Sequence, residues 1–388
     1  MFDFKILKKI GRARTAEYLT PHGVLTTPAF IPVATKATVK TLDSDDVRKI
    51  GFNSVLANTY HLMLEPGSGL VKKMGGLHKF MDWQGPIFTD SGGYQVFSLG
   101  KGITHNTGKI RKNNLTIGFP TSDSKKSLIK ITDNGVEFRS HIDGRKIFLR
   151  PEDSIKIQEE LGADIIFAFD ECTSPYDEKK YVEKSLERTH SWAKHSLLAH
   201  KRKDQALFGI VQGGDWRDLR EESGKFISAL NFHGFGIGGS FGKKEMREVL
   251  DWTIPLLPEE KPRHMLGIGV IEDIFDAVER GIDTLDCVEP TRLGRHGTLL
   301  SSSGRMRILN GSYKTDKKPI EKNCSCLLCK KYSRAYLHHL FKADEILGMR
   351  LATIHNLTFM NGLMADIRKN INNGKFKEFK KKFLKKFI

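Results

Sequence analysis

Two aspartates stand at the ends of short apolar runs, where their carboxylates could act on one reacting bond. Asp90 ends the run 86–91 and Asp286 lies in the run 283–289. Paired carboxylates on opposing strands can flank one bond and divide acid, base and nucleophile roles between them. The alternative is that each aspartate only caps the helix that follows it, a common use of Asp at such a junction.

Three further runs also end in polar or glycine-rich segments. They are Asp170-Glu171-Cys172, Gln212-Gly213-Gly214 and Gly238-Gly239. Polar residues that converge from several strand ends are typical of an active site rather than of isolated caps. We therefore interpret these five segments as one site.

A cysteine cluster lies farther along the chain. Cys324, Cys326 and Cys329 form the pattern C-x-C-x-x-C, and His355 follows after twenty-five intervening residues. Three thiols so close together cannot all pair in disulfides, but they can bind a tetrahedral zinc ion with a distant histidine as the fourth ligand. His338 and His339 compete for that place, and the alternative to a metal is three reduced thiols without a role. A closed four-ligand site would be structural.

Eight β-rich runs recur in the first three hundred residues, with helical patterns between most of them. The runs are 30–35, 54–60, 86–91, 165–171, 207–213, 234–239, 264–269 and 283–289, and the helical patterns are 43–50, 151–161, 180–200, 216–230, 244–256 and 271–280. This alternation predicts parallel strands with crossover helices. Eight strands predict the α/β class and a (β/α)8 TIM barrel, whose chemistry sits where the strands end.

Two domains are expected. The barrel is assigned to residues 1–300, and a small zinc-binding subdomain near the C-terminus, followed by a basic helix, to residues 301–388. The segment 101–130 is rich in Gly, Asn, Ser and Lys, which predicts a surface excursion or hairpin. The strand pattern stops after Glu289, and residues 291–297 are expected to form a basic loop.

The composition is that of a globular protein, and the excess positive charge is local. With 39% apolar and 28% charged residues, the chain is neither disordered nor collagen-like, and it contains no apolar run long enough to span a membrane. Of the net charge of +17, the segments 101–130 and 375–388 contribute +6 each. Such segments attract phosphate backbones through counterion release, or else they are solvated surfaces that aid solubility.

The last fourteen residues predict an amphipathic helix. Phe376, Phe379, Phe383 and Phe387 recur at steps of three and four, and lysines occupy much of the remaining surface. Its apolar face could dock on the same chain, on a second subunit or on a membrane. We expect docking on protein, with the lysines facing RNA.

Taken together, these blocks resemble the queuine/archaeosine tRNA-ribosyltransferases, also called tRNA-guanine transglycosylases. The resemblance spans most of the chain and rests on the segments 58–62 (NTYHL), 89–95 (TDSGGYQ), 138–141 (FRSH), 169–172 (FDEC), 209–214 (GIVQGG), 236–239 (GIGG) and 286–292 (DCVEPTR) and on the cysteine pattern. It implies a (β/α)8 barrel with a zinc subdomain. The implied activity replaces the wobble guanine of tRNA by a 7-deazaguanine without breaking the strand.

The resemblance also implies roles for individual residues. Asp286 is the expected nucleophile and Asp90 the acid that later acts as a base. Asn58 and Gln95 are expected to orient Asp90, and the alternative for either is a satisfied buried amide without a role. The base-binding residues implied are Ser91, Tyr94, Asp170, Gln212, Gly239 and Leu266, and the metal ligands are Cys324, Cys326, Cys329 and His355. Arg292 and Arg295 are expected to contact tRNA phosphates. For Tyr94 the alternative is an ordinary core aromatic, and for the two arginines it is solvated surface charge.

The cofactor, partners and location follow from the same resemblance. We expect one structural Zn²⁺ per chain, tRNA and a 7-deazaguanine base as substrates, a homodimer, a cytoplasmic location and no membrane attachment. Cys172 resembles the bacterial type, which uses 7-aminomethyl-7-deazaguanine. The alternatives are a queuine-inserting enzyme of eukaryotic type, a non-catalytic tRNA-binding partner subunit and a barrel glycoside hydrolase, although the last gives no reason for the zinc pattern.

Overall fold

The structure is a computed structural model that describes residues 2–97, 129–239 and 243–387. The predicted excursion 101–130 lies outside the described residues, apart from its last two positions. Among the described residues, no helix combines the length and the apolar character that crossing a membrane requires.

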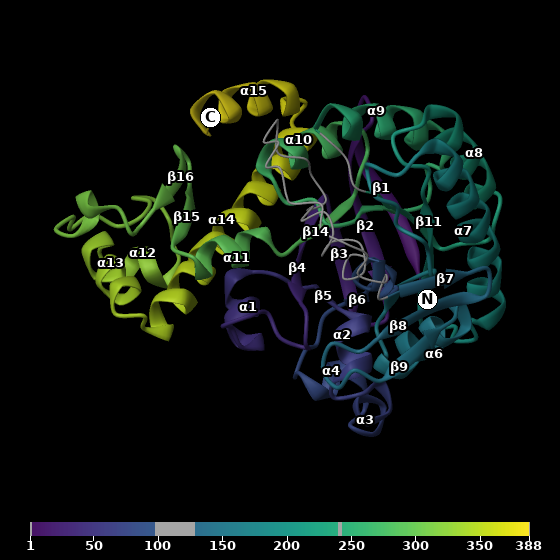
Figure 1. Cartoon of the computed structure of the whole chain (residues 1–388). Coiled ribbons are helices and arrows are strands. Elements are labelled where there is room, and N and C mark those ends of the chain that lie inside the picture. Colours follow the sequence, from purple (N-terminus) through teal and green to yellow (C-terminus); the bar gives the residue numbers. More distant parts are fainter. Residues whose placement is uncertain (1, 98–128, 240–242, 388) are drawn as a thin grey trace. The chain divides into compact units, whose positions relative to one another are not determined.

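Eight parallel strands form a closed barrel, as the sequence predicts (Figure 1). Their order around the barrel is β10-β11-β12-β13-β14-β4-β5-β6. The strands are β4 (Ala29–Ala34), β5 (Val55–Ala57), β6 (Ile87–Thr89), β10 (Ile165–Phe167), β11 (Ala206–Val211), β12 (Gly234–Ile237), β13 (Arg263–Met265) and β14 (Thr284–Cys287). Each of them overlaps one of the eight predicted runs, so the predicted fold class is confirmed.

The chain divides into two compact units, which share the barrel strands. Unit 1 comprises residues 1–2, 58–77 and 88–266, and unit 2 comprises residues 3–57, 78–87 and 267–388. The predicted domain boundary at residue 300 stays a prediction.

Unit 1 contains five barrel strands covered by helices. The helices α6 (Pro151–Leu161), α7 (Lys179–Ala199), α8 (Arg217–Ser228) and α9 (Lys243–Thr253) match four predicted helical patterns, and α9 continues into the 3-10 turn η1 (Ile254–Leu256). Inside the strands, Phe167 packs edge-on against Phe208 at a ring-centroid distance of 5.6 Å and also contacts the buried His264. This aromatic core fixes the strands whose ends carry the polar segments.

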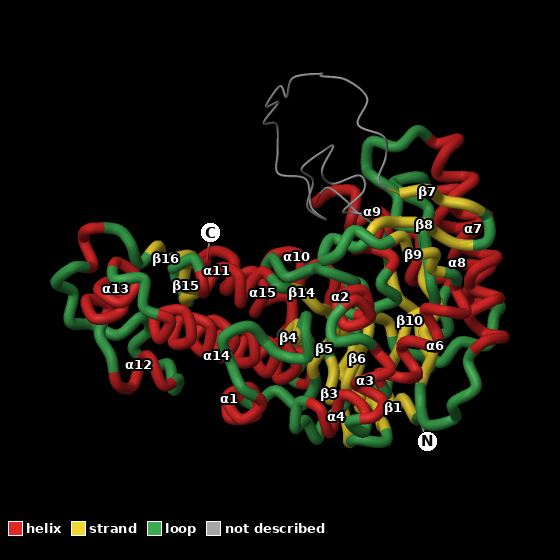
Figure 2. The backbone as a smooth tube through the Cα atoms, turned by 60° about the horizontal axis from the view of Figure 1, so that its bottom comes forward, coloured by secondary structure: helices red, strands yellow, loops and turns green. Residues whose placement is uncertain are grey.

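Unit 1 also carries a small antiparallel sheet that the sequence patterns did not predict. Its strands are β7 (Ile129–Thr132), β8 (Gly135–Arg139) and β9 (Lys146–Leu149), which lie side by side next to α7 in Figure 2. The Trp192 indole of α7 donates to the Asp133 carbonyl at 2.6 Å and ties the sheet to that helix. Short helices α2 (Thr59–Leu64) and α3 (Ser68–Lys73) complete the unit, and α4 (Gly76–Phe80) lies at its boundary.

Unit 2 begins with a second unpredicted antiparallel sheet. It consists of β1 (Asp3–Ile10), β2 (Ala13–Thr20) and β3 (Gly23–Thr27), and it is followed by the predicted helix α1 (Ser44–Ile50). The predicted helix α10 (Ile271–Glu279) leads into β14, which pairs with β4. Arg14 of β2 donates twice to Asp283, just before β14, at 2.9 and 2.7 Å, and the two side chains are 1% and 0% exposed. This buried ion pair joins the sheet to the barrel strand.

The C-terminal part of unit 2 corrects two expectations. The strand pattern does not stop after Glu289, because β15 (Thr298–Ser301) and β16 (Gly304–Arg307) form a hairpin. Residues 291–295 are not a loop, because they belong to α11 (Glu289–Arg295), and only residues 296–297 form a turn. A proline lies in the first turn of α11, where its missing N–H costs no hydrogen bond. The remaining elements are η2 (Gly311–Tyr313), α12 (Leu327–Lys331), α13 (Arg334–Lys342), α14 (Ile346–Asn372) and α15 (Phe376–Phe387).

The Arg14–Asp283 pair yields a stability prediction. Arg14→Met leaves the fully buried Asp283 carboxylate without its bidentate partner, so we expect the free energy of unfolding in urea to fall by about 3–5 kcal/mol. The double variant Arg14→Met/Asp283→Asn removes the charge that was left behind and should recover part of this loss. Equal unfolding midpoints for the single variant and the wild type would contradict the role of the pair.

Candidate active site and metal centre

A buried carboxylate that follows β10 organises the polar residues of unit 1. Asp170 is 7% exposed and accepts hydrogen bonds from Ser91 Oγ at 3.1 Å and from Gln212 Nε2 at 2.6 Å. The three residues follow β6, β10 and β11, so neighbouring parallel strands bring them together at one edge. The structure thus unites three of the six predicted base-binding residues.

The Asp170 cluster depends on glycines that leave space for it. A Cβ atom on Gly238, after β12, would collide with the Gln212 side-chain amide. A Cβ atom on Gly93 would lie 2.7 Å from the Asp170 carbonyl oxygen. Close packing around the carboxylate therefore explains why positions 93 and 238 are glycines.

Asp90 is oriented by the start of α2. Its carboxylate accepts hydrogen bonds from the Asn58 side-chain amide and, at 2.9 Å, from the Thr59 backbone N–H. Asn58 also caps α2, because its oxygen accepts from the His61 backbone N–H. The predicted contact between Asn58 and Asp90 is present. The orienting role predicted for Gln95 stays a prediction.

The other predicted base-binding residues also follow strands of unit 1. Tyr94 is half-buried in the helical turn that starts at Gly93, and Leu266 is half-buried directly after β13. Gly239 is buried after β12 with a φ of 132°, a backbone conformation that L side chains rarely adopt. The role of these three residues as base ligands stays a prediction.

Helix α7 fixes the backbone on both sides of Asp170. The sequence patterns did not reveal this role of α7. Side chains of α7 bond to this segment: Ser196 accepts from the Phe169 N–H, Thr189 accepts from the Glu171 N–H, and Ser185 donates to the Glu171 carbonyl. The buried Glu171 carboxylate accepts from Arg188 at 2.8 Å and from the Tyr181 hydroxyl at 2.6 Å. Burial, together with the Glu171 charge, raises the pKa of Tyr181, so this residue remains a neutral donor.

Unit 2 contributes the second predicted catalytic carboxylate. Asp286 lies in β14 and is 9% exposed, and its Oδ1 accepts from the Gly267 backbone N–H at 2.8 Å. Gly267 has a φ of 71°, which favours glycine and aims its N–H at the carboxylate. Asp286 is thus held by backbone and does not act as the side-chain cap of α11, because Val288 occupies the N-cap position of that helix.

Arg292 and Arg295 lie in the last turn of α11, where a helix dipole favours cations. Arg292 is exposed, and Arg295 is half-buried. In the described part of the chain, Arg295 Nη1 is buried without a hydrogen-bond partner. Burial and the neighbouring Arg292 charge lower the pKa of Arg295. An anion would satisfy this nitrogen and relieve the repulsion between the two guanidinium groups.

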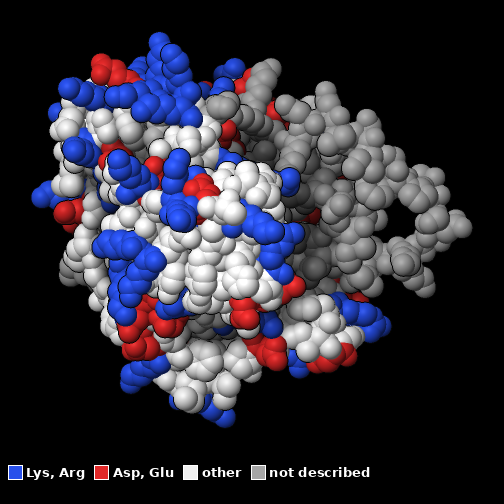
Figure 3. All heavy atoms as spheres, turned by 90° about the vertical axis from the view of Figure 1, so that its left-hand side faces the viewer, with Lys and Arg blue, Asp and Glu red and all other residues white. Residues whose placement is uncertain are grey.

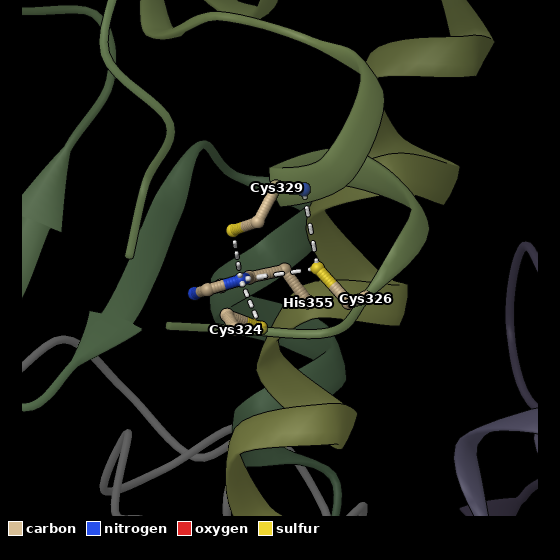
Figure 4. A group of neighbouring side chains, drawn as sticks. All are labelled: Cys324, Cys326, Cys329 and His355. Carbon is tan, nitrogen blue, oxygen red and sulfur yellow. Dashed lines mark hydrogen bonds between the residues drawn. The ribbon is translucent and has the colours of Figure 1, made fainter. Parts of the chain in front are cut away.

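The predicted metal ligands come together in unit 2. Figure 4 shows Cys324, Cys326, Cys329 and His355 pointing toward one another, and their ligand atoms all lie within 4.8 Å of each other. The distances from His355 Nδ1 to the three sulfurs are 3.8, 3.5 and 3.3 Å. A tetrahedral zinc ion with ordinary Zn–S and Zn–N bonds places its ligands about 3.5–3.8 Å apart, so the four side chains fit one.

The histidine is oriented by its other ring nitrogen. His355 Nε2 contacts the Leu300 carbonyl at 2.7 Å, which places a proton on Nε2 and leaves Nδ1 free to bind a metal. Of the two competing histidines, His338 is buried with Nδ1 at 2.7 Å from the Ile308 carbonyl. Neither His338 nor His339 belongs to the group of ligands that meet among the described residues.

The chain is similar to known proteins over nearly its whole length. A family model described as "Queuine tRNA-ribosyltransferase" matches residues 9–128 and 116–388. Relatives named queuine tRNA-ribosyltransferase include proteins of Desulforamulus reducens (49% identical, covering 98% of this chain and 96% of the relative) and Staphylococcus haemolyticus (48%, covering 99% and 95%). A third, from Halothermothrix orenii, is 49% identical and covers 97% of this chain and 95% of its own.

A matched pair of substitutions can test whether Gly238 must lack a side chain for Gln212 to reach Asp170. Gly238→Ala should displace the Gln212 amide from Asp170 and lower the free energy of unfolding by about 1–3 kcal/mol, as overpacking does. Gly362→Ala is the control, because Gly362 is exposed in α14 with open space at its Cβ position, and it should be neutral or stabilising by up to about 1 kcal/mol. Urea unfolding measures both, and equal effects would refute the steric explanation.

Proposed function

Because this chain belongs to the queuine tRNA-ribosyltransferase family, we propose that it exchanges the wobble guanine in the anticodon of tRNA for 7-aminomethyl-7-deazaguanine. The observation that carries this proposal is the buried Asp170 carboxylate between Ser91 and Gln212. An ionised carboxylate is costly to bury and is retained where it has a ligand to bind.

Asp170 is suited to the edge of guanine. The ring N–H and the exocyclic amine of guanine are adjacent donors, and a carboxylate accepts both at once. The Gln212 amide and the Gly239 backbone N–H would donate to the base carbonyl. Tyr94 would stack on the extruded base, with Leu266 against its other face, as in other enzymes that act on flipped nucleotides.

The two aspartates would then divide the chemistry. An oxygen of Asp286 attacks C1′ of the ribose while the bond from C1′ to the guanine nitrogen breaks, and Asp90 gives its proton to the departing base. The covalent ribosyl–Asp286 ester keeps the RNA strand intact. Asp90 next takes a proton from the incoming base, whose nitrogen attacks C1′ and releases Asp286. Proton and bond counts balance over the cycle.

Arg292 and Arg295 supply a contact for the RNA backbone in this proposal. The unpartnered Arg295 Nη1 beside a second guanidinium is an environment that phosphate would complete. Gly294, between them, packs against α14, where a Cβ would lie 3.0 Å from the Ala352 carbonyl carbon. Both arginines therefore lie on a helix that packs closely against α14.

The identity of the inserted base needs its own test. Incubating tRNA separately with 7-aminomethyl-7-deazaguanine and with queuine, followed by mass analysis of the nucleosides, separates the proposed activity from the eukaryotic type. Only the first base should be incorporated. Incorporation of queuine alone would refute the bacterial assignment and leave the exchange reaction standing.

The exchange reaction itself is tested with labelled guanine and unfractionated tRNA. The wild type should incorporate the label, and Asp286→Ala should reduce incorporation by at least about 10⁴-fold, because the covalent intermediate cannot form. Binding of tRNA should persist in the variant, as measured by filter retention. A covalent RNA–protein band formed by Asp286→Ala on a denaturing gel would disprove the assignment of the nucleophile.

We further propose that Cys324, Cys326, Cys329 and His355 hold one structural zinc ion. The closed set of four ligands leaves no open position for substrate, so the ion would stabilise the fold. Cys329→Ser should lower the zinc content from about one per chain and reduce the thermal midpoint, because metal binding contributes folding free energy. Cys172→Ser, outside the cluster, is the control and should keep its zinc by elemental analysis. Metal-free wild-type protein with an unchanged melting curve would refute the site.

The remaining expectations about partners and location stay predictions. A homodimer is testable by light scattering over a range of protein concentrations. A cytoplasmic location is testable by fractionation of cells that express the protein.

A further inference from the structure

The apolar face of α15 is covered by unit 2, as the sequence led us to expect. Phe275 of α10 contacts the rings of Phe376, Phe379 and Phe383 at centroid distances of 6.2, 5.7 and 5.4 Å. Phe359 of α14 contacts Phe383 and Phe387. The phenylalanine face of the helix is therefore engaged in packing within its own chain.

One lysine completes the docking of α15. Lys380 Nζ forms ion pairs with Asp276 at 2.6 Å and with Glu279 at 2.5 Å, both on α10, and its side chain is only 18% exposed. At the end of the helix, the Phe387 carbonyl lies 2.8 Å from the position of a Cβ on Gly304, so β16 also approaches α15 closely. These contacts hold the helix in one place.

The other lysines of this segment point into solvent. Lys375, Lys377, Lys381, Lys382, Lys385 and Lys386 are all exposed, and Glu378 is the one acidic residue among them. Figure 3 shows Lys and Arg side chains gathered at the upper left of the face that it draws. Twelve helical residues span about 18 Å, so these charges are concentrated on a short rod.

The arrangement of these lysines opposes the stability of the helix. Lys377, Lys381 and Lys385 are spaced four residues apart, so like charges repel along one stripe, at a cost of about 0.2–0.5 kcal/mol per pair. Lys375 and Lys377 lie at the N-terminal end, where the helix dipole disfavours cations. The dipole accounts for Lys385 and Lys386 in the last turn but not for the rest of the stripe.

We propose that the six exposed lysines of residues 375–386 bind the phosphate backbone of RNA, as a surface separate from Arg292 and Arg295. This inference rests on the proposed function for its ligand, tRNA. A row of ammonium groups on a docked helix suits a regular row of phosphates, and counterion release supplies the binding free energy. An anionic membrane offers phosphates too, but the amphipathic helices that bind membranes insert their apolar face, and the apolar face of α15 is packed on α10 and α14.

The experiment is a salt titration of tRNA binding. The stripe variant Lys377→Gln/Lys381→Gln/Lys385→Gln is compared with the wild type, and unfractionated tRNA is the probe, between 50 and 200 mM KCl. Each lost phosphate contact should reduce the slope of log K against log salt by about 0.7–0.9, so the slope should become shallower by about 2–3. The stripe variant should melt at the same temperature as the wild type or slightly higher, because like-charge repulsion has been removed.

The matched control removes the same charge elsewhere in unit 2. Lys5, Lys8 and Lys9 are exposed on β1, and their triple change to Gln should leave the slope as in the wild type. Equal slopes for the stripe variant and the wild type, or an equal loss in both triple variants, would overturn the proposal. The proposal would also be overturned if phosphatidylserine vesicles bound the wild type but not the stripe variant while the salt slope of tRNA binding stayed unchanged.

The result of the salt titration can be distinguished from the result of the test of the proposed function. Guanine incorporation by the wild type is measured in the same preparations. Incorporation with an unchanged slope in the stripe variant refutes only the lysine surface. A shallower slope in the stripe variant, with no incorporation by the wild type, supports the surface as an RNA-binding site and refutes the exchange reaction.

Discussion

The burial of one carboxylate, Asp170, constrains much of unit 1. Removing a charged group from water costs several kcal/mol unless its oxygens accept hydrogen bonds, and Ser91 and Gln212 provide them from the neighbouring strand ends. Gln212 reaches Asp170 because Gly238 has no side chain. The backbone around Asp170 is in turn bonded to α7 through Thr189 and Ser196. The position of this one carboxylate thus depends on four strands and a helix, which a rigid barrel holds in place.

The sequence predicts the barrel well because its signals are strong. Each barrel strand is a short apolar run, and the helices between them have clear periodicity, so all eight strands and six helices are placed within a few residues. The two antiparallel sheets were missed for physical reasons. The strands β7–β9 have only four or five residues, and packing against α7 stabilises them. The strands β1 and β2 carry exposed lysines and a buried arginine, which mask the alternation of a half-buried strand.

Within the site, residue types at strand ends are predictable, but only some of their partners are. The grouping of Ser91, Asp170 and Gln212 follows from the barrel, because neighbouring parallel strands end at one edge. The Glu171–Arg188 ion pair could not be found this way, since Arg188 is one of many charged residues on α7 and only the packed structure shows which of them reaches Glu171. The orientation of Asp286 by a backbone N–H leaves no side-chain signal, apart from the glycine at position 267.

The cysteine cluster and the arginines of α11 are linked through α14. His355 and Asn356 are adjacent on this helix, and while His355 faces the three thiols, Asn356 donates to the carbonyls of Pro290 and Thr298 and accepts from the Leu300 N–H. The start of α11 and strand β15 are therefore bonded to the turn of α14 that carries the histidine. Since β15 also supplies the Leu300 carbonyl that orients His355, an ion bound there would stabilise α14, β15 and α11 together. An ion that touches no substrate would in this way help to determine where Arg292 and Arg295 lie, because the ligand His355 is adjacent on α14 to Asn356, which is bonded to the start of α11.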